Sequence, residues 1–314
     1  MGRPSPGPQT ARLWSVSTRQ QGSIPAGLAR RSILALPLAG LLAPVPGVAH
    51  AECDARRCVL RHLRFFLKTS NPLDRALLEQ RLWCYLPANL AGQRVVQTHV
   101  SVPHQIYPDA LGHLILELSF DRFPPFAHKI VTIDATLALN GSERRQELAA
   151  PREWLAAERF IESDHPQIGL LARQLGRSTP ALSARAIFEW VQGNIRYAGY
   201  LAEDRGALQA LLTSQGDCTE YADLVVALCR ALGIPARMVG GYVVDGDAVV
   251  LPQDYHNWAE VFWDGQWQVV DAQKGDWLGA SAHYVVFRIY RDVASNPVGL
   301  AHRFRISGDL KATL

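Results

Sequence analysis

The chain has 314 residues, of which 48% are hydrophobic and 19% charged, and its formal net charge is +3. This composition is typical of a globular protein long enough for two domains, and it excludes a fibrous repeat or a largely disordered chain. No stripe of basic residues interleaved with aromatic residues is present, so we expect no nucleic-acid partner.

Residues 1–51 predict an export signal. Arg30-Arg31 precede an apolar run from Ile33 to Ala43, and the small-residue pattern Ala49-His50-Ala51 marks a cleavage site. The run is shorter than the roughly 20 apolar residues of a spanning helix, so we expect no stable membrane span. A twin-arginine signal and an ordinary secretory signal behind an early start both fit. We therefore expect a periplasmic or secreted protein.

Residues 52–145 predict a small β domain. From about Leu73 to Leu139 the sequence favours strands, and its short apolar segments are Arg94 to Val102, Leu111 to Phe120 and Lys129 to Leu139. Short strands at this spacing indicate an antiparallel β sandwich or barrel. Asn140-Gly141-Ser142 then marks the connection to a second domain, residues 146–314.

Five cysteines follow the predicted signal, namely Cys53, Cys58, Cys84, Cys218 and Cys229. In an oxidising compartment an odd number leaves at least one thiol free. We expect one disulfide between Cys84 and either Cys53 or Cys58, and the sequence leaves that choice open. Since no matching histidine cluster stands near these cysteines, we expect no metal site, and we expect no cofactor.

The second domain begins with helices. Thr179-Pro180 can open one whose apolar positions follow a helical period. A second helix is predicted from Cys218 to Leu232, because Asp217 is a natural N-cap, Glu220 completes a capping box and Gly233 supplies the stop. This helix is apolar over most of its surface, so we expect it to be buried.

Strands follow the helices, which predicts an α+β layout. They run from Ala236 to Val244, Tyr255 to Trp263 and Gln266 to Asp271, and the last two meet across a turn at Asp264-Gly265.

The turn fixes the register of this hairpin. A two-residue turn pairs Trp263 with Gln266, which makes His256 and Asp271 diagonal neighbours on one face, roughly 5 to 8 Å apart between β carbons. The carboxylate can then reach one ring nitrogen and leave the other facing outward.

Cys218 is the candidate nucleophile. A helix N-terminus favours an anion, so we expect it to lower the pKa of this thiol, and a nearby imidazole would complete its activation. The predicted packing of the helix on the sheet brings Cys218 to His256 and Asp271, giving a catalytic triad. Cys229 lies about 16 Å away along the same helix and is predicted to be core packing.

The motifs resemble a known family. They are Gly216-Asp217-Cys218, Cys229 to Arg237, Gly241-Tyr242, His256 to Val261, and Gly265-Gln266-Trp267 through Val270-Asp271. In this order they are similar to the core of the bacterial transglutaminase-like superfamily, over about residues 180 to 275. The resemblance implies a papain-like fold in which Cys218 is the nucleophile, His256 the general base and then acid, and Asp271 the residue that orients it.

The resemblance also points to groups around the nucleophile. The backbone N–H of Cys218 is expected to hold the oxyanion, with a second donor from Tyr197 or Gln215. Independently of the resemblance, Trp258, Trp263 and Trp267 are expected to pack in the sheet, and Trp258, on the face predicted for His256, is also a candidate wall of the substrate site. Two departures from the family pattern are Asn257, where alanine is usual, and Ala272-Gln273, where Pro-Thr is usual.

The predicted function is that of a thiol enzyme acting on amide bonds of peptides or proteins through a thioester, with hydrolysis as the main reading. Transfer of a glutamine acyl group to an amine is the first alternative, because the chemistry up to the thioester is identical. The second alternative is a noncatalytic binding or scaffold protein that retains the fold.

Overall fold

The computed structural model describes residues 58–140, 151–293 and 295–314. The predicted export signal and Cys53 lie outside the described residues. All described residues fall within one contact unit, Ala51–Leu314. Within the described ranges, no helix is long and apolar enough to cross a bilayer.

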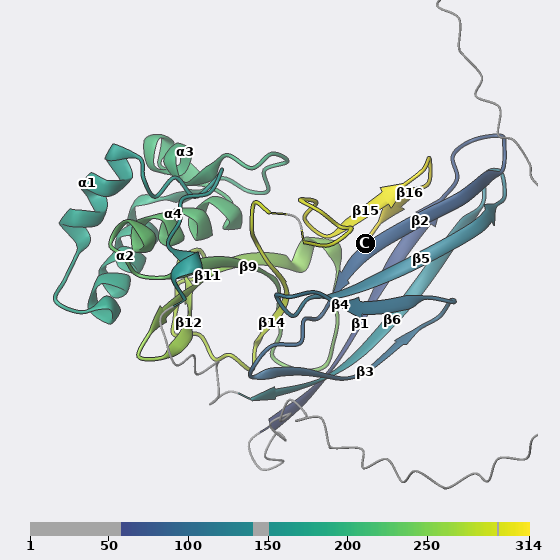
Figure 1. The fold of residues 1–314 in the computed structure, drawn as a ribbon, viewed down its shortest axis with the longest axis horizontal. Coiled ribbons are helices and arrows are strands. Elements are labelled where there is room, and N and C mark those ends of the chain that lie inside the picture. The colour runs from purple at the N-terminus through teal and green to yellow at the C-terminus, as the bar shows by residue number, and fades with distance from the viewer. Residues whose placement is uncertain (1–57, 141–150, 294) are drawn as a thin grey trace, which may run out of the picture. The chain divides into compact units, whose positions relative to one another are not determined.

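The first half of the described chain forms two facing antiparallel sheets, as predicted (Figure 1). One contains β1 (Cys58–Ser70), β6 (His128–Asn140) and β3 (Gln93–Val100); the other contains β2 (Leu77–Leu86), β5 (Leu114–Phe123) and β4 (Gln105–Pro108). Both sheets contribute to one apolar core, for example Leu67 from β1 and Leu82 from β2. β1 begins well before Leu73, because Leu63, Phe65 and Leu67 point inward between polar residues.

Strands from the second half of the chain join these two sheets. β15 (Phe304–Ser307) pairs with β2, β16 (Lys311–Thr313) pairs with β1, and β10 (Ala248–Val249) runs parallel to β1. These strands cross the division predicted at residues 145 and 146, and that boundary stays a prediction.

The predicted pairing of Cys84 is wrong. Cys84 is a free thiol with 0% exposure, because its side chain points from β2 into the core between the sheets. Cys58, at the start of β1, is disulfide-bonded. Burial in this core therefore keeps the Cys84 thiol away from solvent.

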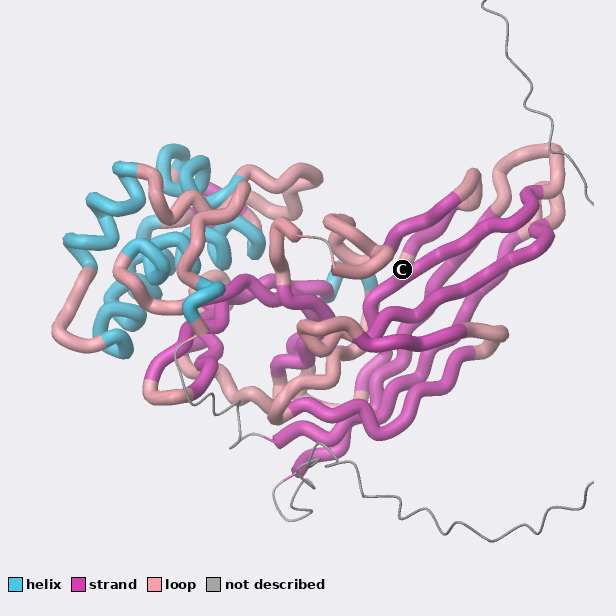
Figure 2. The backbone as a smooth tube through the Cα atoms, in the orientation of Figure 1, coloured by secondary structure: helices cyan, strands magenta, loops and turns pink. Residues whose placement is uncertain are grey.

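The second half is an α+β core. Its antiparallel sheet has the order β13 (Asp276–Trp277), β12 (Gln266–Asp271), β11 (Tyr255–Trp263), β9 (Ala236–Val243) and β14 (Tyr284–Ile289). Four helices gather at one side of this sheet (Figure 2), namely α1 (Pro166–Leu175), α2 (Pro180–Asn194), α3 (Gly206–Thr213) and α4 (Cys218–Ala231). For α4, β9, β11 and β12, both ends were predicted from the sequence, and each predicted end lies within one residue of the observed one.

Helix α4 is the centre of this core. Every residue from Thr219 to Arg230 is buried, because α1, α2 and α3 cover one side and β9 and β11 the other. The predicted burial of this helix is therefore confirmed, and its first turn is held rigidly against the sheet.

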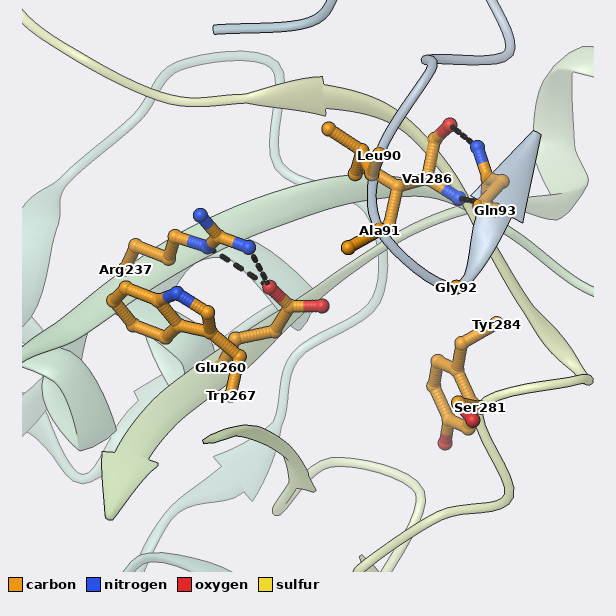
Figure 3. A pocket seen from close by; sticks show the side chains of 10 residues that line it. All are labelled: Leu90, Ala91, Gly92, Gln93, Arg237, Glu260, Trp267, Ser281, Tyr284 and Val286. Atoms are coloured by element: carbon orange, nitrogen blue, oxygen red, sulfur yellow. Dashed lines mark hydrogen bonds and ion pairs between the residues drawn. The ribbon is translucent and has the colours of Figure 1, made fainter. Parts of the chain in front are cut away.

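A glutamine links the two halves of the described chain. Gln93 accepts a hydrogen bond from the Val286 backbone N–H at 2.9 Å and donates to the carbonyls of Val286 and Ala88 at 2.7 and 2.8 Å (Figure 3). Gln93 lines a cavity of about 30 Å³, and Arg237 and Glu260 line it as well. Arg237 donates two hydrogen bonds to one oxygen of Glu260. Buried polar groups at this junction thus satisfy one another.

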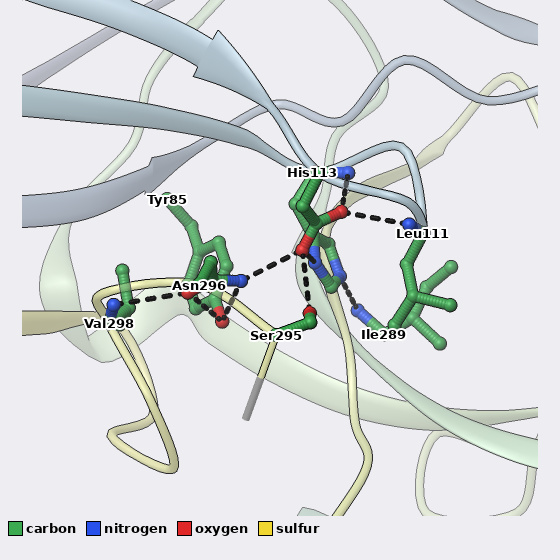
Figure 4. Close-up of polar contacts among 8 residues, drawn as sticks. Tyr85, Leu111, His113, Ile289, Ser295, Asn296 and Val298 are labelled. Atoms are coloured by element: carbon green, nitrogen blue, oxygen red, sulfur yellow. Dashed lines mark hydrogen bonds and ion pairs between the residues drawn. The ribbon is translucent and has the colours of Figure 1, made fainter. Parts of the chain in front are cut away.

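A second link is built around a buried histidine. His113 Nε2 accepts the Ile289 backbone N–H at 2.8 Å, so Nδ1 carries the proton and donates it to Asp109 at 2.7 Å (Figure 4). Asn296 donates to the same carboxylate oxygen at 2.8 Å. Burial alone would raise the pKa of Asp109, but these hydrogen bonds lower it below its ordinary value.

Acid should weaken this link. The pKa of Asp109 is lower in the folded chain than the roughly 3.9 of an unfolded aspartate, so its stabilisation is present above that pH and is lost as the pH falls below it. We expect Asp109→Asn to cost about 1–3 kcal/mol of unfolding free energy at pH 7 and a smaller amount at pH 3, where the unfolded carboxyl group is already largely protonated. Urea unfolding at both pH values measures this, and an equal cost at both would contradict it.

Candidate active site

The first turn of α4 presents Cys218. Asp217 Oδ1 accepts the Thr219 N–H at 2.7 Å, and Glu220 Oε2 accepts the Asp217 N–H at 2.9 Å. This is the predicted capping box. The Glu220 side chain lies so close to Gly216 that a β carbon there would collide with it. A glycine two residues before the cysteine is therefore a steric requirement of the cap.

The hairpin places His256 beside Asp271, as predicted. Asp264 and Gly265 both have positive φ, and Trp263 pairs with Gln266 across them. His256 Nε2 lies 2.7 Å from Asp271 Oδ2, with both side chains buried. When Nε2 holds a proton for the carboxylate, Nδ1 is free to act as a base.

Asn257 connects the hairpin to the nucleophile helix. Its backbone N–H donates a hydrogen bond to the Cys218 sulfur. Its side-chain Nδ2 donates to Thr219 Oγ1 at 3.0 Å, and its Oδ1 accepts from Tyr290 at 3.2 Å. Because Asn257 follows His256 directly, these contacts hold the start of α4 at the strand that carries the imidazole.

The expected lowering of the Cys218 pKa by the helix dipole is wrong in direction. Burial of the thiol raises its pKa to about 12, and the nearby carboxylates of Asp217 and Asp271 push it the same way, against the hydrogen bond from Asn257. Desolvation and carboxylate charge both favour the protonated thiol. For the sulfur to attack a carbonyl carbon, a base would therefore have to remove its proton.

Asp271 is held by more than the histidine. Its Oδ1 accepts the Lys274 backbone N–H at 3.0 Å, and its Oδ2 also accepts from the Tyr284 hydroxyl at 3.0 Å. The same hydroxyl lies 2.9 Å from Asp276 Oδ2. The single hydroxyl proton of Tyr284 is shared between the two carboxylates, and this contact helps to hold the Asp271 side chain in position. Burial, followed by the charges of Asp271 and Asp276, raises the pKa of Tyr284.

The two candidate oxyanion residues lie on a short sheet beside the helix start. β7 (Arg196–Tyr197) pairs in parallel with β8 (Gln215–Gly216), and Tyr197 stands opposite Gly216. Tyr197 is 52% exposed, and its pKa is raised by burial and by the charge of Cys218. Tyr197 is thus near the thiol, and Gln215 is half-buried on the adjoining strand. The oxyanion roles of both residues stay predictions.

Trp258 does not wall a substrate site. It is 1% exposed, stacks on the His256 ring at 6.2 Å between centroids and packs edge-on against Tyr284 at 5.0 Å. A side chain in this position supports the imidazole from behind, because no substrate can contact it. The face of the strand was predicted correctly, but the depth of burial was not.

Comparison with known proteins settles the family. A model of the transglutaminase-like superfamily matches residues 170–272. These residues belong to the transglutaminase-like superfamily. The match spans α2, α4 and the hairpin, and so contains Cys218, His256 and Asp271.

Individual relatives agree over different parts of the chain. Kyphoscoliosis peptidase of Homo sapiens is 32% identical over 104 residues, which cover 30% of this chain and 16% of that protein. This chain therefore spans less than a fifth of that relative. Uncharacterized protein ML0607 of Mycobacterium leprae is 26% identical over 208 residues, or 60% of this chain and 73% of that protein.

A solved structure shares the fold. The crystal structure of a provisionally assigned cysteine protease from Cytophaga hutchinsonii superposes with a TM-score of 0.56 at 18% identity, covering 82% of this chain and 90% of that one. The likeness includes more than the transglutaminase-like core, since that core alone is 103 residues long.

The two departures from the family pattern have different places in the transglutaminase-like core. Asn257 is the buried link between strand and helix described above. Ala272 is 3% exposed and packs in the core of the helices and sheet. Asn257 and Ala272 are too buried to shape a substrate cleft directly, whereas Gln273, the other residue of the second departure, is half-buried.

Tyr284 was not found from the sequence, because its contact with Asp271 joins β14 and β12, which are not neighbours in the sheet. We expect Tyr284→Phe to lower kcat roughly tenfold with little change in KM, since it removes one hydrogen bond to the residue that orients His256. Steady-state kinetics on any amide substrate of the chain measures this. A rise in KM at constant kcat would show that Tyr284 contributes to substrate binding instead.

Proposed function

We propose that this chain is a thiol hydrolase of peptide or protein amide bonds that works through a thioester on Cys218. One observation carries the proposal: His256 and Asp271 are buried and 2.7 Å apart, and Asn257, which directly follows His256, hydrogen-bonds through its backbone to the Cys218 sulfur. A base, its orienting carboxylate and a thiol in this arrangement are suited to nucleophilic acyl chemistry.

In the proposed cycle His256 carries the proton from the thiol to the departing amine. His256 Nδ1 takes the thiol proton as the Cys218 sulfur bonds to the amide carbon, and Asp271 stabilises the imidazolium. The C–N bond then breaks, and the imidazolium gives its proton to the departing amine. Water attacks the thioester with His256 again as base, which releases the acid and restores the thiol. The raised pKa of Cys218 supports proton transfer during attack over a standing thiolate.

Iodoacetamide labelling tests the nucleophile. If His256 must remove the proton, His256→Ala should slow the labelling of Cys218 strongly at pH 7. Mass spectrometry locates the label. A rate unchanged by the His256 substitution would remove the base from the proposal and favour the noncatalytic scaffold reading.

The acyl acceptor requires a separate measurement. A glutamine-containing peptide library is incubated with a fluorescent primary amine, and the Cys218→Ala variant serves as the control. Peptide fragments or free ammonia without amine incorporation support hydrolysis. Incorporation of the amine supports acyl transfer, the first alternative, and overturns hydrolysis as the main reaction.

We also propose that the chain acts outside the cytoplasm. The predicted export signal and the disulfide at Cys58 support this, since structural disulfides persist in oxidising compartments. N-terminal sequencing of the protein recovered from the periplasm or medium should begin at Glu52, and an intact Met1 in a cytoplasmic fraction would contradict it.

A further inference from the structure

A cavity of about 430 Å³ extends from the first turn of α4 along the side of that helix. Thr219, the residue after Cys218, lines it, and so does Tyr290, which is hydrogen-bonded to Asn257. The cavity thus begins one residue from the nucleophile and within the hydrogen-bond network that holds it.

Asp223 lies deeper in the same cavity. It is 1% exposed, and among the residues that the structure describes neither of its carboxylate oxygens has a hydrogen-bond partner. Asp223 follows Thr219 by one helical turn, so both face the same side of α4. A buried carboxyl group without partners is costly, and a native structure holds one where something else satisfies it.

The charges around Asp223 favour a cation. Burial and the carboxylates of Glu220 and Asp204 raise its pKa well above the ordinary value. Two of the three arginines that line the cavity have polar partners, because Arg291 pairs with Glu158 at 3.0 Å and Arg288 donates to the Ala301 carbonyl at 2.6 Å; the third, Arg159, lies over the Phe160 ring. Asp223, whose two oxygens have no hydrogen-bond partner among the described residues, can therefore pair with an incoming positive charge.

The walls of the cavity suit an aliphatic stem. Ile161, Met238 and Leu300 contribute apolar surface to the cavity that Asp223 also lines. Long cationic side chains bury their methylene groups on such surface and keep the charged end for a polar partner. The pattern of apolar walls above one acid thus matches the chemistry of a lysine or arginine side chain.

We propose that this cavity is a specificity site for a cationic side chain of the peptide substrate, with Asp223 as the residue that pairs with the charge. Asp223 lies five residues, or about 7.5 Å of helix rise, from Cys218. A cation held there is too far away to attack a thioester, since reacting atoms must approach to about 3–3.5 Å. The bound group therefore selects the substrate and is not the acyl acceptor.

This inference rests on the proposed function, and its test is kept separate from turnover. The Cys218→Ala chain is titrated by NMR with Nα-acetyl methylamides of lysine, arginine, norleucine and glutamate. We expect the lysine or the arginine probe to bind roughly tenfold or more tightly than norleucine, which has a neutral side chain of similar length. Equal binding, or preference for glutamate, overturns the site even if the wild-type chain cleaves amides.

Two further substitutions in the same background assign the preference. Asp223→Asn keeps the shape of the side chain and should abolish the preference for a cation, with a thermal melt to confirm folding. Asp204→Asn changes another acid of the cavity, which pairs with His302 at 2.8 Å, and should leave the preference in place. A preference that survives in Asp223→Asn, or is lost only in Asp204→Asn, would overturn the assignment to Asp223.

Discussion

Replacing Cys218 by alanine should lower kcat/KM for amide cleavage by at least roughly 10⁴-fold, because removing the nucleophile of a catalytic triad leaves only substrate binding and oxyanion stabilisation. The side chain is partly exposed at the start of α4, so the loss should not come from unfolding. Steady-state kinetics with a cleavable peptide and a thermal melt of each protein measure the two effects separately.

Cys229 provides the matched control for this experiment. It lies on the same helix and is fully buried in the core. Its neighbours in that core are hydrophobic side chains, not the acid and base of the candidate site. Cys229→Ala should keep its activity per folded molecule and lose stability instead. Comparable losses of activity in both variants would mean that the thiol chemistry has been assigned to the wrong residue.

Asp271→Asn should lower kcat roughly 10³- to 10⁴-fold while the fold is retained. An asparagine cannot stabilise the imidazolium, and its amide can hydrogen-bond to the histidine tautomer that carries its proton on the wrong nitrogen. The buried contact of 2.7 Å leaves no room for water to replace the carboxylate. The effect is read from kcat at saturating substrate and from its pH profile.

Asp276→Asn separates this role from general loss of charge. Asp276 shares the Tyr284 hydroxyl with Asp271 and stands opposite Asp271 in the strand register, whereas the hydrogen bond to His256 comes from Asp271. It should cost far less activity than Asp271→Asn. If the two variants were equally impaired, the pair of carboxylates would have to be treated as one functional unit.

Local chemistry made the hairpin and the nucleophile helix predictable. The two-residue turn at Asp264-Gly265 needs positive φ at both positions, and this fixed the register that puts His256 beside Asp271. Asp217 and Glu220 fixed the start of α4 in the same way. Each of these features depends on residues within a few positions of one another, where sequence patterns carry their strongest information.

Features that depend on distant contacts were not predictable. Tyr284 reaches Asp271 although β9 and β11 lie between their two strands in the sheet, and Trp258 packs edge-on against the same Tyr284. The pKa of Cys218 depends on how much protein surrounds the thiol, which the helix position alone does not reveal. The free state of Cys84 follows from the sandwich core, which needs both sheets.

The pairing of β15 and β16 with β2 and β1 sets an order of events during folding. Until residues 304–313 have left the ribosome, each of those two early strands keeps an unpaired edge on which another chain can add. Completion of the sandwich therefore waits for the last part of the chain, long after its first strands exist, and truncation at residue 303 should promote aggregation even though every residue of the triad is retained.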